Sequence, residues 1–153
     1  MIASEAGVQD GAQDGAQGSA SAPHVLIVDD EPGDIELMRI AFEMCQIPVC
    51  IVAAADGAQA MELLRQSISS RQEPELVVLD LNMPRMDGWA VIAALRAIGL
   101  TERIPVIVLS TSRHREDMER CLKAGASAFF SKPDDLGQLL TLTRTLSTYF
   151  RNP

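Results

Sequence analysis

The chain has 153 residues and a hydrophobic fraction of 47%, which is enough for one domain with a substantial core. Its formal net charge of -8 argues against nucleic acid as a direct partner, because binding to phosphate backbones requires clustered Lys and Arg. No apolar run approaches the roughly 20 residues of a membrane-spanning helix, and nothing resembles a signal peptide, so we expect a cytoplasmic protein without a membrane segment.

Residues 1–23 are rich in Gly, Ala, Gln and Ser and contain almost no large apolar side chains. Such a segment cannot bury enough apolar surface to offset the entropy lost on ordering, so we expect a disordered tail. A partner-binding role for this tail is the alternative. We expect the folded domain over residues 24–150, with no separate output domain in this chain.

Five short apolar runs predict buried strands, and a segment with helical spacing follows each of them. The strands are expected at 24–28, 49–54, 76–80, 104–109 and 127–131. The helices are expected at about 32–45, 57–68, 89–98, 113–124 and 135–150. Each connection between strands is too long for a hairpin, which indicates right-handed βαβ units. The predicted fold class is therefore α/β, a flavodoxin-like three-layer sandwich whose five-stranded parallel sheet has the order 2-1-3-4-5.

Polar side chains stand where four of these strands end. Asp29 and Asp30 follow the first strand, Asp80 ends the third, Ser110 follows the fourth and Lys132 follows the fifth. Because the carboxyl ends of parallel strands share one edge of the sheet, we expect these residues to converge. Three neighbouring carboxylates repel one another unless a proton or a cation lies among them, and oxygen ligands of this kind suit Mg²⁺.

This set of residues predicts phosphoryl transfer to Asp80. An ionised carboxylate needs no general base to act as a nucleophile, so catalysis reduces to positioning and charge neutralisation. Lys132 would supply a positive charge and Ser110 a hydroxyl donor for a phosphoryl group attached to Asp80.

The motifs around these residues resemble those of the response-regulator receiver domain of two-component signalling, over about residues 24–150. They are Val28-Asp29-Asp30, Asp80-Leu81-Asn82-Met83-Pro84 with Asp87-Gly88, Leu109-Ser110-Thr111, and Lys132-Pro133. The resemblance implies that Asp80 is the phospho-acceptor. It also implies that Asp30, Asp80 and the backbone carbonyl of Asn82 bind Mg²⁺, with Asp29 assisting.

The resemblance implies further roles near the phosphoryl group. Ser110 and Lys132 would contact that group, and Phe129 would be the aromatic switch residue that moves together with Ser110. Asn82, Thr111 and Ser112 occupy positions at which family members tune the hydrolysis of the acyl phosphate. Thr111 departs from the small residue that is usual in the family, and its larger side chain would narrow access to the phosphoryl group.

The implied function is that of a single-domain response regulator, which takes a phosphoryl group from the phosphohistidine of a histidine kinase and signals by protein–protein contact. Two short sequences most resemble those of stand-alone receivers paired with phytochrome-type kinases. They are Pro32-Gly33-Asp34 and Lys132-Pro133-Asp134-Asp135-Leu136. A histidine phosphotransferase or another protein target is a further expected partner. The domain would catalyse its own phosphorylation and dephosphorylation without being an enzyme in the usual sense.

Two other functions compete with this interpretation. A phosphatase of the haloacid-dehalogenase type also pairs a nucleophilic Asp with Ser or Thr, Lys and acidic metal ligands. In this chain, however, the acidic pair precedes Asp80 and no Asp-x-Asp motif carries the nucleophile. The second alternative is a binding module on a receiver scaffold that is never phosphorylated, and the complete set of polar residues argues against it.

The last helix carries two apolar stripes. The expected inward stripe consists of Leu136, Leu140, Thr143 and Phe150. The second stripe has 3-4-3 spacing, which is typical of a seam between packed helices, and consists of Leu139, Leu142, Leu146 and Tyr149. We expect the second stripe to form a homodimer or partner surface, with additional core contact as the alternative.

Overall fold

The computed structural model describes residues 22–81, 83 and 87–150. The strands are β2 (His24–Val28), β3 (Cys50–Ala54), β4 (Leu76–Asp80), β5 (Val106–Ser110) and β6 (Ala128–Ser131). The helices are α1 (Pro32–Met44), α2 (Gly57–Ser69), α3 (Gly88–Ala97), the short 3-10 helix η2 (Leu100–Glu102), α4 (Arg115–Ala124) and α5 (Leu136–Ser147). Residues 1–21 of the predicted tail lie outside the described residues.

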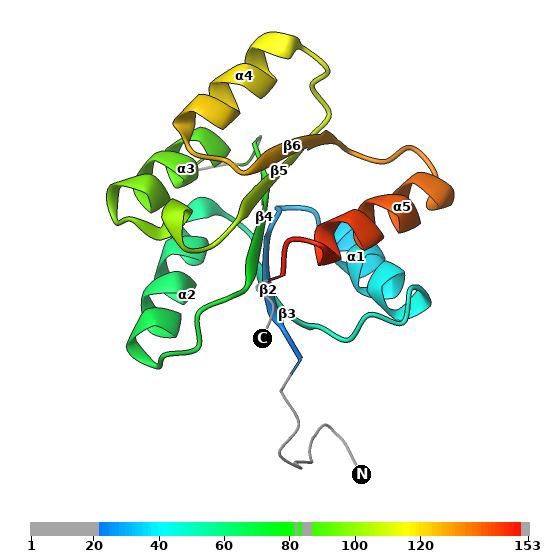
Figure 1. Cartoon of the computed structure of the whole chain (residues 1–153), viewed down its shortest axis with the longest axis horizontal. Coiled ribbons are helices and arrows are strands. Elements are labelled where there is room, and N and C mark those ends of the chain that lie inside the picture. The colour runs from blue at the N-terminus through cyan, green and yellow to red at the C-terminus, as the bar shows by residue number, and fades with distance from the viewer. Residues whose placement is uncertain (1–21, 82, 84–86, 151–153) are drawn as a thin grey trace.

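The strands form one parallel sheet in the order β3-β2-β4-β5-β6, which is the predicted order 2-1-3-4-5. Helices α2, α3 and α4 cover one face of the sheet, and α1 and α5 cover the other (Figure 1). The predicted three-layer sandwich is therefore confirmed. Within the part of the chain that the structure describes, no helix has the length and apolar character needed to cross a membrane.

The apolar runs of the central strands β2, β4 and β5 are continuous because these strands are buried on both faces of the sheet. Alternate residues of a strand point to opposite faces, so Leu26 and Val28 pack under α2 and α3, whereas Val25 and Ile27 pack under α1 and α5. Strands β4 and β5 divide their side chains between the two faces in the same way. Asp29, Asp80 and Ser110 therefore stand at the ends of well-packed strands.

The expected orientation of the last helix was wrong in part: Thr143 is buried as predicted, and Leu140 and Phe150 pack against the core, but the second stripe also faces inward, which was the stated alternative. Leu139, Leu142 and Leu146, which were assigned to the outer stripe, are buried in the core between α5, α1 and the sheet. Leu136, assigned to the inner stripe, is 52% exposed. The 3-4-3 spacing does place these leucines on one side of α5, and that side packs against the sheet and α1. The homodimer surface proposed on this stripe therefore loses its basis.

Two arginines join α3 to α4. The Arg120 guanidinium lies 3.9 Å from the centre of the Trp89 ring, which is a cation–π arrangement. Arg96 Nη1 donates a hydrogen bond to the carbonyl of Lys123 at 2.7 Å. Trp89 itself is half-buried against the core. These contacts hold α4 against α3 on the face of the sheet that α2, α3 and α4 cover (Figure 1).

Candidate functional site

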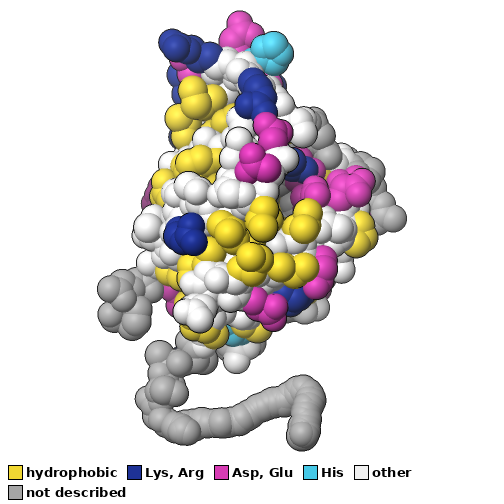
Figure 2. All heavy atoms as spheres, turned by 90° about the vertical axis from the view of Figure 1, so that its right-hand side faces the viewer, with side chains coloured by type: hydrophobic (Ala, Val, Ile, Leu, Met, Phe, Trp, Pro, Cys, Tyr) yellow, Lys and Arg dark blue, Asp and Glu magenta, His cyan; other side chains and the backbone are white. Residues whose placement is uncertain are grey.

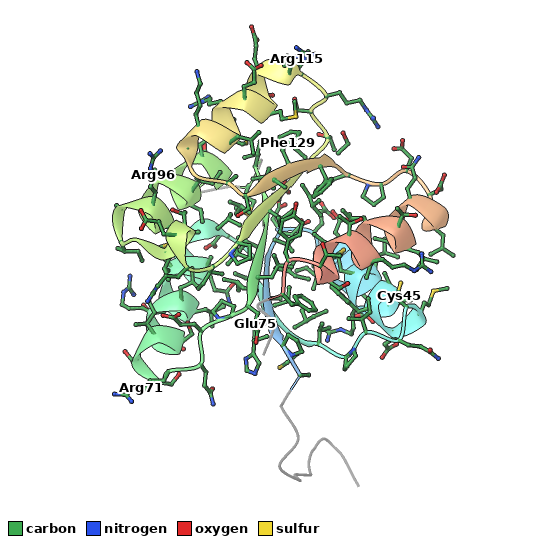
Figure 3. The ribbon with its side chains drawn as sticks, in the orientation of Figure 1. Cys45, Arg71, Glu75, Arg96, Arg115 and Phe129 are labelled. Carbon is green, nitrogen blue, oxygen red and sulfur yellow. The ribbon has the colours of Figure 1, made fainter. Side chains whose placement is uncertain are left out.

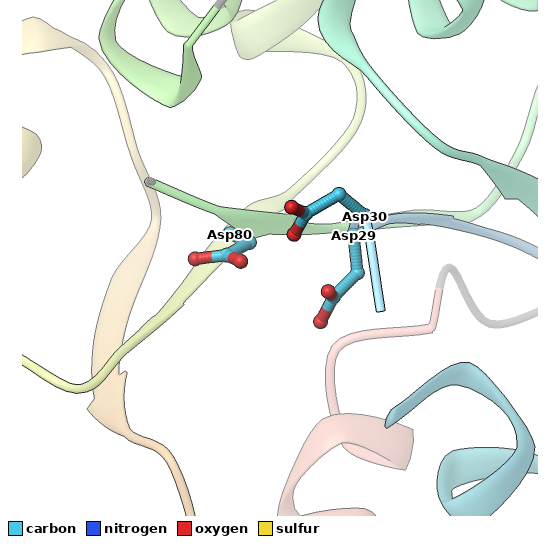
Figure 4. Close-up of side chains that lie close together, drawn as sticks. All are labelled: Asp29, Asp30 and Asp80. Carbon is cyan, nitrogen blue, oxygen red and sulfur yellow. The ribbon is translucent and has the colours of Figure 1, made fainter. Parts of the chain in front are cut away.

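The predicted polar residues meet at the carboxyl edge of the sheet. Asp29 follows β2 directly, Asp80 is the last residue of β4, Ser110 is the last residue of β5, and Lys132 follows β6. Figure 4 shows the carboxylates of Asp29, Asp30 and Asp80 side by side at the ends of β2 and β4, which are paired in the sheet. Asn82, expected to offer its carbonyl to a metal, lies outside the described residues.

Lys132 lies at the centre of the charged groups. Its Nζ is 3.3 Å from Asp80 Oδ2, 3.3 Å from Asp34 Oδ2 and 3.6 Å from Asp29 Oδ2. Asp34, in the first turn of α1, was not predicted as a site residue. In the sequence Asp34 stood out only as part of Pro32-Gly33-Asp34, and it reaches Lys132 because α1 begins shortly after β2 ends.

The acidic cluster offers an all-oxygen donor set. One carboxylate oxygen from each of Asp29, Asp30 and Asp80 lies within 4.8 Å of the others. Asp29 and Asp80 are buried, with 7% and 6% of their surface exposed, whereas Asp30 is exposed. Hard oxygen ligands at the rim of a pocket suit Mg²⁺, which keeps several of its own waters. These residues therefore fit the predicted metal.

The electrostatics of the cluster show an excess of negative charge. Burial raises the pKa of Asp29 from 3.8 to about 6, against the lowering effects of the Glu31 N–H and of Lys132, and with smaller raising effects from Asp80 and Asp34. Burial by itself would lower the pKa of Lys132, but the neighbouring Asp29 and Asp80 carboxylates and the hydrogen bonds to Asp34 and Asp80 raise it above its usual value. Lys132 therefore stays charged, and a cation would relieve the remaining repulsion.

Asp29→Asn is expected to stabilise the metal-free protein at neutral pH by about 3 kcal/mol. Burial raises the pKa of Asp29 from 3.8 to about 6 in the folded state. As the pH rises, the unfolded chain therefore loses this proton first, and the stability of the wild type falls between about pH 3.8 and pH 6. The asparagine oxygen can still accept the hydrogen bond from Glu31 N, which Asp29 Oδ1 accepts at 2.9 Å.

The check is urea unfolding in EDTA at about pH 4 and about pH 7.5. The gain from Asp29→Asn should be small at about pH 4, where the folded-state carboxyl is protonated and the unfolded-state carboxyl is only partly ionised, and full at about pH 7.5. Added Mg²⁺ should reduce the difference in unfolding free energy between the variant and the wild type, because only the wild type has the Asp29 carboxylate as a metal ligand. An unchanged or lowered stability at the higher pH, without metal, would contradict the assigned electrostatics.

The β5–α4 connection holds Ser110 firmly. Ser110 is fully buried; its Oγ accepts a hydrogen bond from Ser112 N at 3.0 Å, and its carbonyl accepts one from Lys132 N at 2.9 Å. Thr111 is exposed. Phe129 is half-buried on the face of the sheet that α4 covers, and Figure 3 shows it between β6 and α4. These positions are compatible with the switch and tuning roles, which remain predictions.

Gly88 has a structural role that its place in the family motif did not reveal. Asp87 caps α3, accepting a hydrogen bond from Ala90 N, and Gly88 begins that helix. A Cβ on Gly88 would lie 2.5 Å from Leu81 Cα and 2.6 Å from the carbonyl oxygen of Asp80. The absence of a side chain is what lets α3 begin directly against the end of β4.

A pocket of about 320 Å³ opens beside Asp80 and Lys132, between α1 and α5. Leu37 and Leu136 line it and are about half exposed, at 51% and 52%. Ile40 and Met44, farther along α1, are also exposed. Figure 2 shows hydrophobic side chains gathered on this side of the molecule, with carboxylates around them.

Comparison with known proteins agrees with this geometry. PrrA of Mycobacterium leprae, a transcriptional regulatory protein, is 36% identical over 126 residues, which are 82% of this chain and 50% of PrrA. This chain spans between 48% and 59% of the length of the first five curated relatives that it matches.

Two solved structures are similar over most of their length. The phosphorylated cyanobacterial phytochrome response regulator RcpA has a TM-score of 0.75 and 30% identity, covering 85% of this chain and 94% of RcpA. The response regulator RPA3017, of red light signalling in R. palustris, has a TM-score of 0.76 and 27% identity, with the same two coverages of 85% and 94%. The family model of the response regulator receiver domain matches residues 25–144. The chain therefore belongs to the receiver-domain family of the response regulators of two-component signalling.

Proposed function

We propose that this receiver takes a phosphoryl group onto Asp80, with Mg²⁺ held by Asp29, Asp30 and Asp80 and by the carbonyl of Asn82. The observation that carries the proposal is the ammonium of Lys132, 3.3 Å from Asp80 Oδ2, at the edge of the carboxylate cluster. A fixed cation beside a buried carboxylate is the arrangement that a bound phosphoryl group requires, because its added negative charge is then neutralised in place.

The proposed step is a displacement at phosphorus. A lone pair of an Asp80 carboxylate oxygen forms the new O–P bond while the N–P bond of the donor phosphohistidine breaks. The electron pair of that bond stays on the imidazole nitrogen, and the ring leaves as neutral imidazole because its other nitrogen carries a proton. No proton has to be removed from Asp80, so positioning and charge neutralisation supply the catalysis. Lys132 and the hydroxyl of Ser110 would stabilise the charge on the phosphoryl oxygens, and the metal, when bound, adds further neutralisation there.

Hydrolysis would reverse the modification when water attacks the same phosphorus and the O–P bond to Asp80 breaks. Asn82, Thr111 and Ser112 would control how easily that water is admitted. The phosphorylated aspartate is thus the signal itself, and the domain catalyses its own phosphorylation and dephosphorylation. Steady release of inorganic phosphate from a small phosphate ester at a rate lost in Asp80→Asn would argue instead for the phosphatase.

The test is intact-mass spectrometry after incubation with acetyl phosphate and Mg²⁺. The wild type should gain one phosphoryl group, the gain should require Mg²⁺, and Asp80→Asn should show none. Asp56→Asn is the matched control, because Asp56 caps α2 through a hydrogen bond from Gln59 N and asparagine caps a helix equally well. The control should be phosphorylated like the wild type. A wild type without the adduct, or an adduct retained in Asp80→Asn, would refute the proposal.

The proposed donor is a histidine kinase, of the phytochrome type. The similarity to RcpA, described as a phytochrome response regulator, and to RPA3017 of red light signalling supports this choice. Leu37 and Leu136, half-exposed in the lining of the pocket, offer apolar contact area next to Asp80, as a protein donor would need. Onward transfer to a histidine phosphotransferase, or contact with another protein target, would complete the signalling step.

A further inference from the structure

We propose that Asp117, on α4, is a positioning residue for the phosphorylation of Asp80, acting through Ser112 on the hydroxyl of Ser110. The inference rests on the proposed function and extends it to a residue outside the phosphoryl-binding edge. It is carried by a chain of two hydrogen bonds that leads from the first turn of α4 to the buried end of β5.

The first hydrogen bond joins the loop to α4. The hydroxyl of Ser112 donates to Asp117 Oδ2 at 2.5 Å, and this oxygen of Ser112 also accepts from His114 N at 3.3 Å. A hydroxyl has one proton, and here it is given to a charged acceptor, which makes the bond short and strong. Ser112 is therefore held from both sides.

The second hydrogen bond passes this constraint to Ser110. The backbone N–H of Ser112 donates to Ser110 Oγ at 3.0 Å, inside the fully buried end of β5. Once its oxygen has accepted this bond, the Ser110 hydroxyl still has its own proton to donate. Since the carbonyl of Ser110 also receives the N–H of Lys132 at 2.9 Å, both expected phosphoryl contacts depend on the same short segment. Asp117 thus orients a donor that it does not touch.

Helix capping is the ordinary explanation for an acidic residue at this place. Asp117 and Glu116 both lie in the first turn of α4, where a carboxylate interacts favourably with the helix dipole. A capping role alone would change the melting temperature and leave the phosphorylation rate unaffected. Glu116 has the same relation to the dipole, so it provides the matched control.

The experiment measures the rate of phosphorylation by acetyl phosphate and Mg²⁺, together with the melting temperature, for wild type, Asp117→Ala, Ser112→Ala, the double variant and Glu116→Ala. We expect Asp117→Ala and Ser112→Ala each to lower the rate about tenfold, as a displaced donor would. The double variant should be no slower than the slower single variant, because both break one hydrogen bond. Asp117→Asn, which can still accept from Ser112, should restore most of the rate.

Glu116→Ala should keep the wild-type rate. Equal rates for wild type and Asp117→Ala would overturn the inference, as would equal losses in Asp117→Ala and Glu116→Ala. Ser112→Ala breaks the same bond from the other end, so it decides the matter if Asp117→Ala does not fold. A wild type that gains no phosphoryl group refutes the proposed function as well, whereas a phosphorylated wild type with an unaffected Asp117→Ala refutes this inference alone.

Discussion

Replacing Lys132 with methionine is expected to slow the phosphorylation of Asp80 by acetyl phosphate by about 10²–10³-fold. Methionine has a similar length but no charge, so the phosphoryl oxygens would lose the cation that lies 3.3 Å from Asp80 Oδ2. Lys132→Arg keeps the charge in a planar group with a different reach, and we expect an intermediate rate. The measurement is the rate at which the adduct forms, followed by intact mass.

The same variant tests the electrostatics of the cluster. Lys132→Met leaves Asp29 and Asp80 buried without the ammonium that now lies within 3.6 Å and 3.3 Å of them. The metal-free variant should therefore melt at a lower temperature than the wild type and gain more from added Mg²⁺. A phosphorylation rate within threefold of wild type would remove Lys132 from the proposed mechanism, whatever happens to the stability.

Gly88→Ala should cost about 3 kcal/mol of unfolding free energy. The new methyl group would lie 2.5 Å from Leu81 Cα and 2.6 Å from the carbonyl oxygen of Asp80, and backbone atoms cannot rotate away as a flexible side chain can. Helix α3 would have to move from the end of β4, breaking the hydrogen bond from Gly88 N to the carbonyl of Leu81. The measurement is urea unfolding.

Gly33→Ala is the matched control. Gly33 is also in the first turn of a helix, but nothing lies within 4 Å of the position of its Cβ. Alanine there should stabilise the protein by up to about 1 kcal/mol, since it reduces the freedom of the unfolded chain. If Gly88→Ala proves as stable as the wild type, α3 can withdraw from Asp80 at little cost. Slower phosphorylation of Gly88→Ala would show that the close contact also positions Asp80.

The sequence was sufficient for the architecture because the three central strands are buried on both faces. Each of these strands is then a short continuous apolar run, and its end is marked by the first polar residue, such as Asp29 or Asp80. The parallel arrangement follows from the connections, and it brings these polar residues to one edge. The convergence of Asp29, Asp80 and Lys132 was therefore predictable without coordinates.

Features that depend on how helices approach the sheet were not predictable. Leu136 and Leu139 are equally apolar, and only the tilt of α5 against α1 decides which of them is buried. Gly88 is a constraint because α3 comes close to β4, a long-range contact with no local signal. Asp34 reaches Lys132 across 98 positions of sequence, and its spacing is equally typical of a solvated helix start.

The stacking of Arg120 on Trp89 gives the molecule an optical property. The chain has a single tryptophan, so all indole emission comes from one place, where α3 meets α4. A guanidinium 3.9 Å from the centre of the ring alters the electric field that the excited indole experiences. Any displacement of α4 that separates the two side chains will therefore change the emission of the unlabelled protein, and stopped-flow fluorescence can follow this displacement in time.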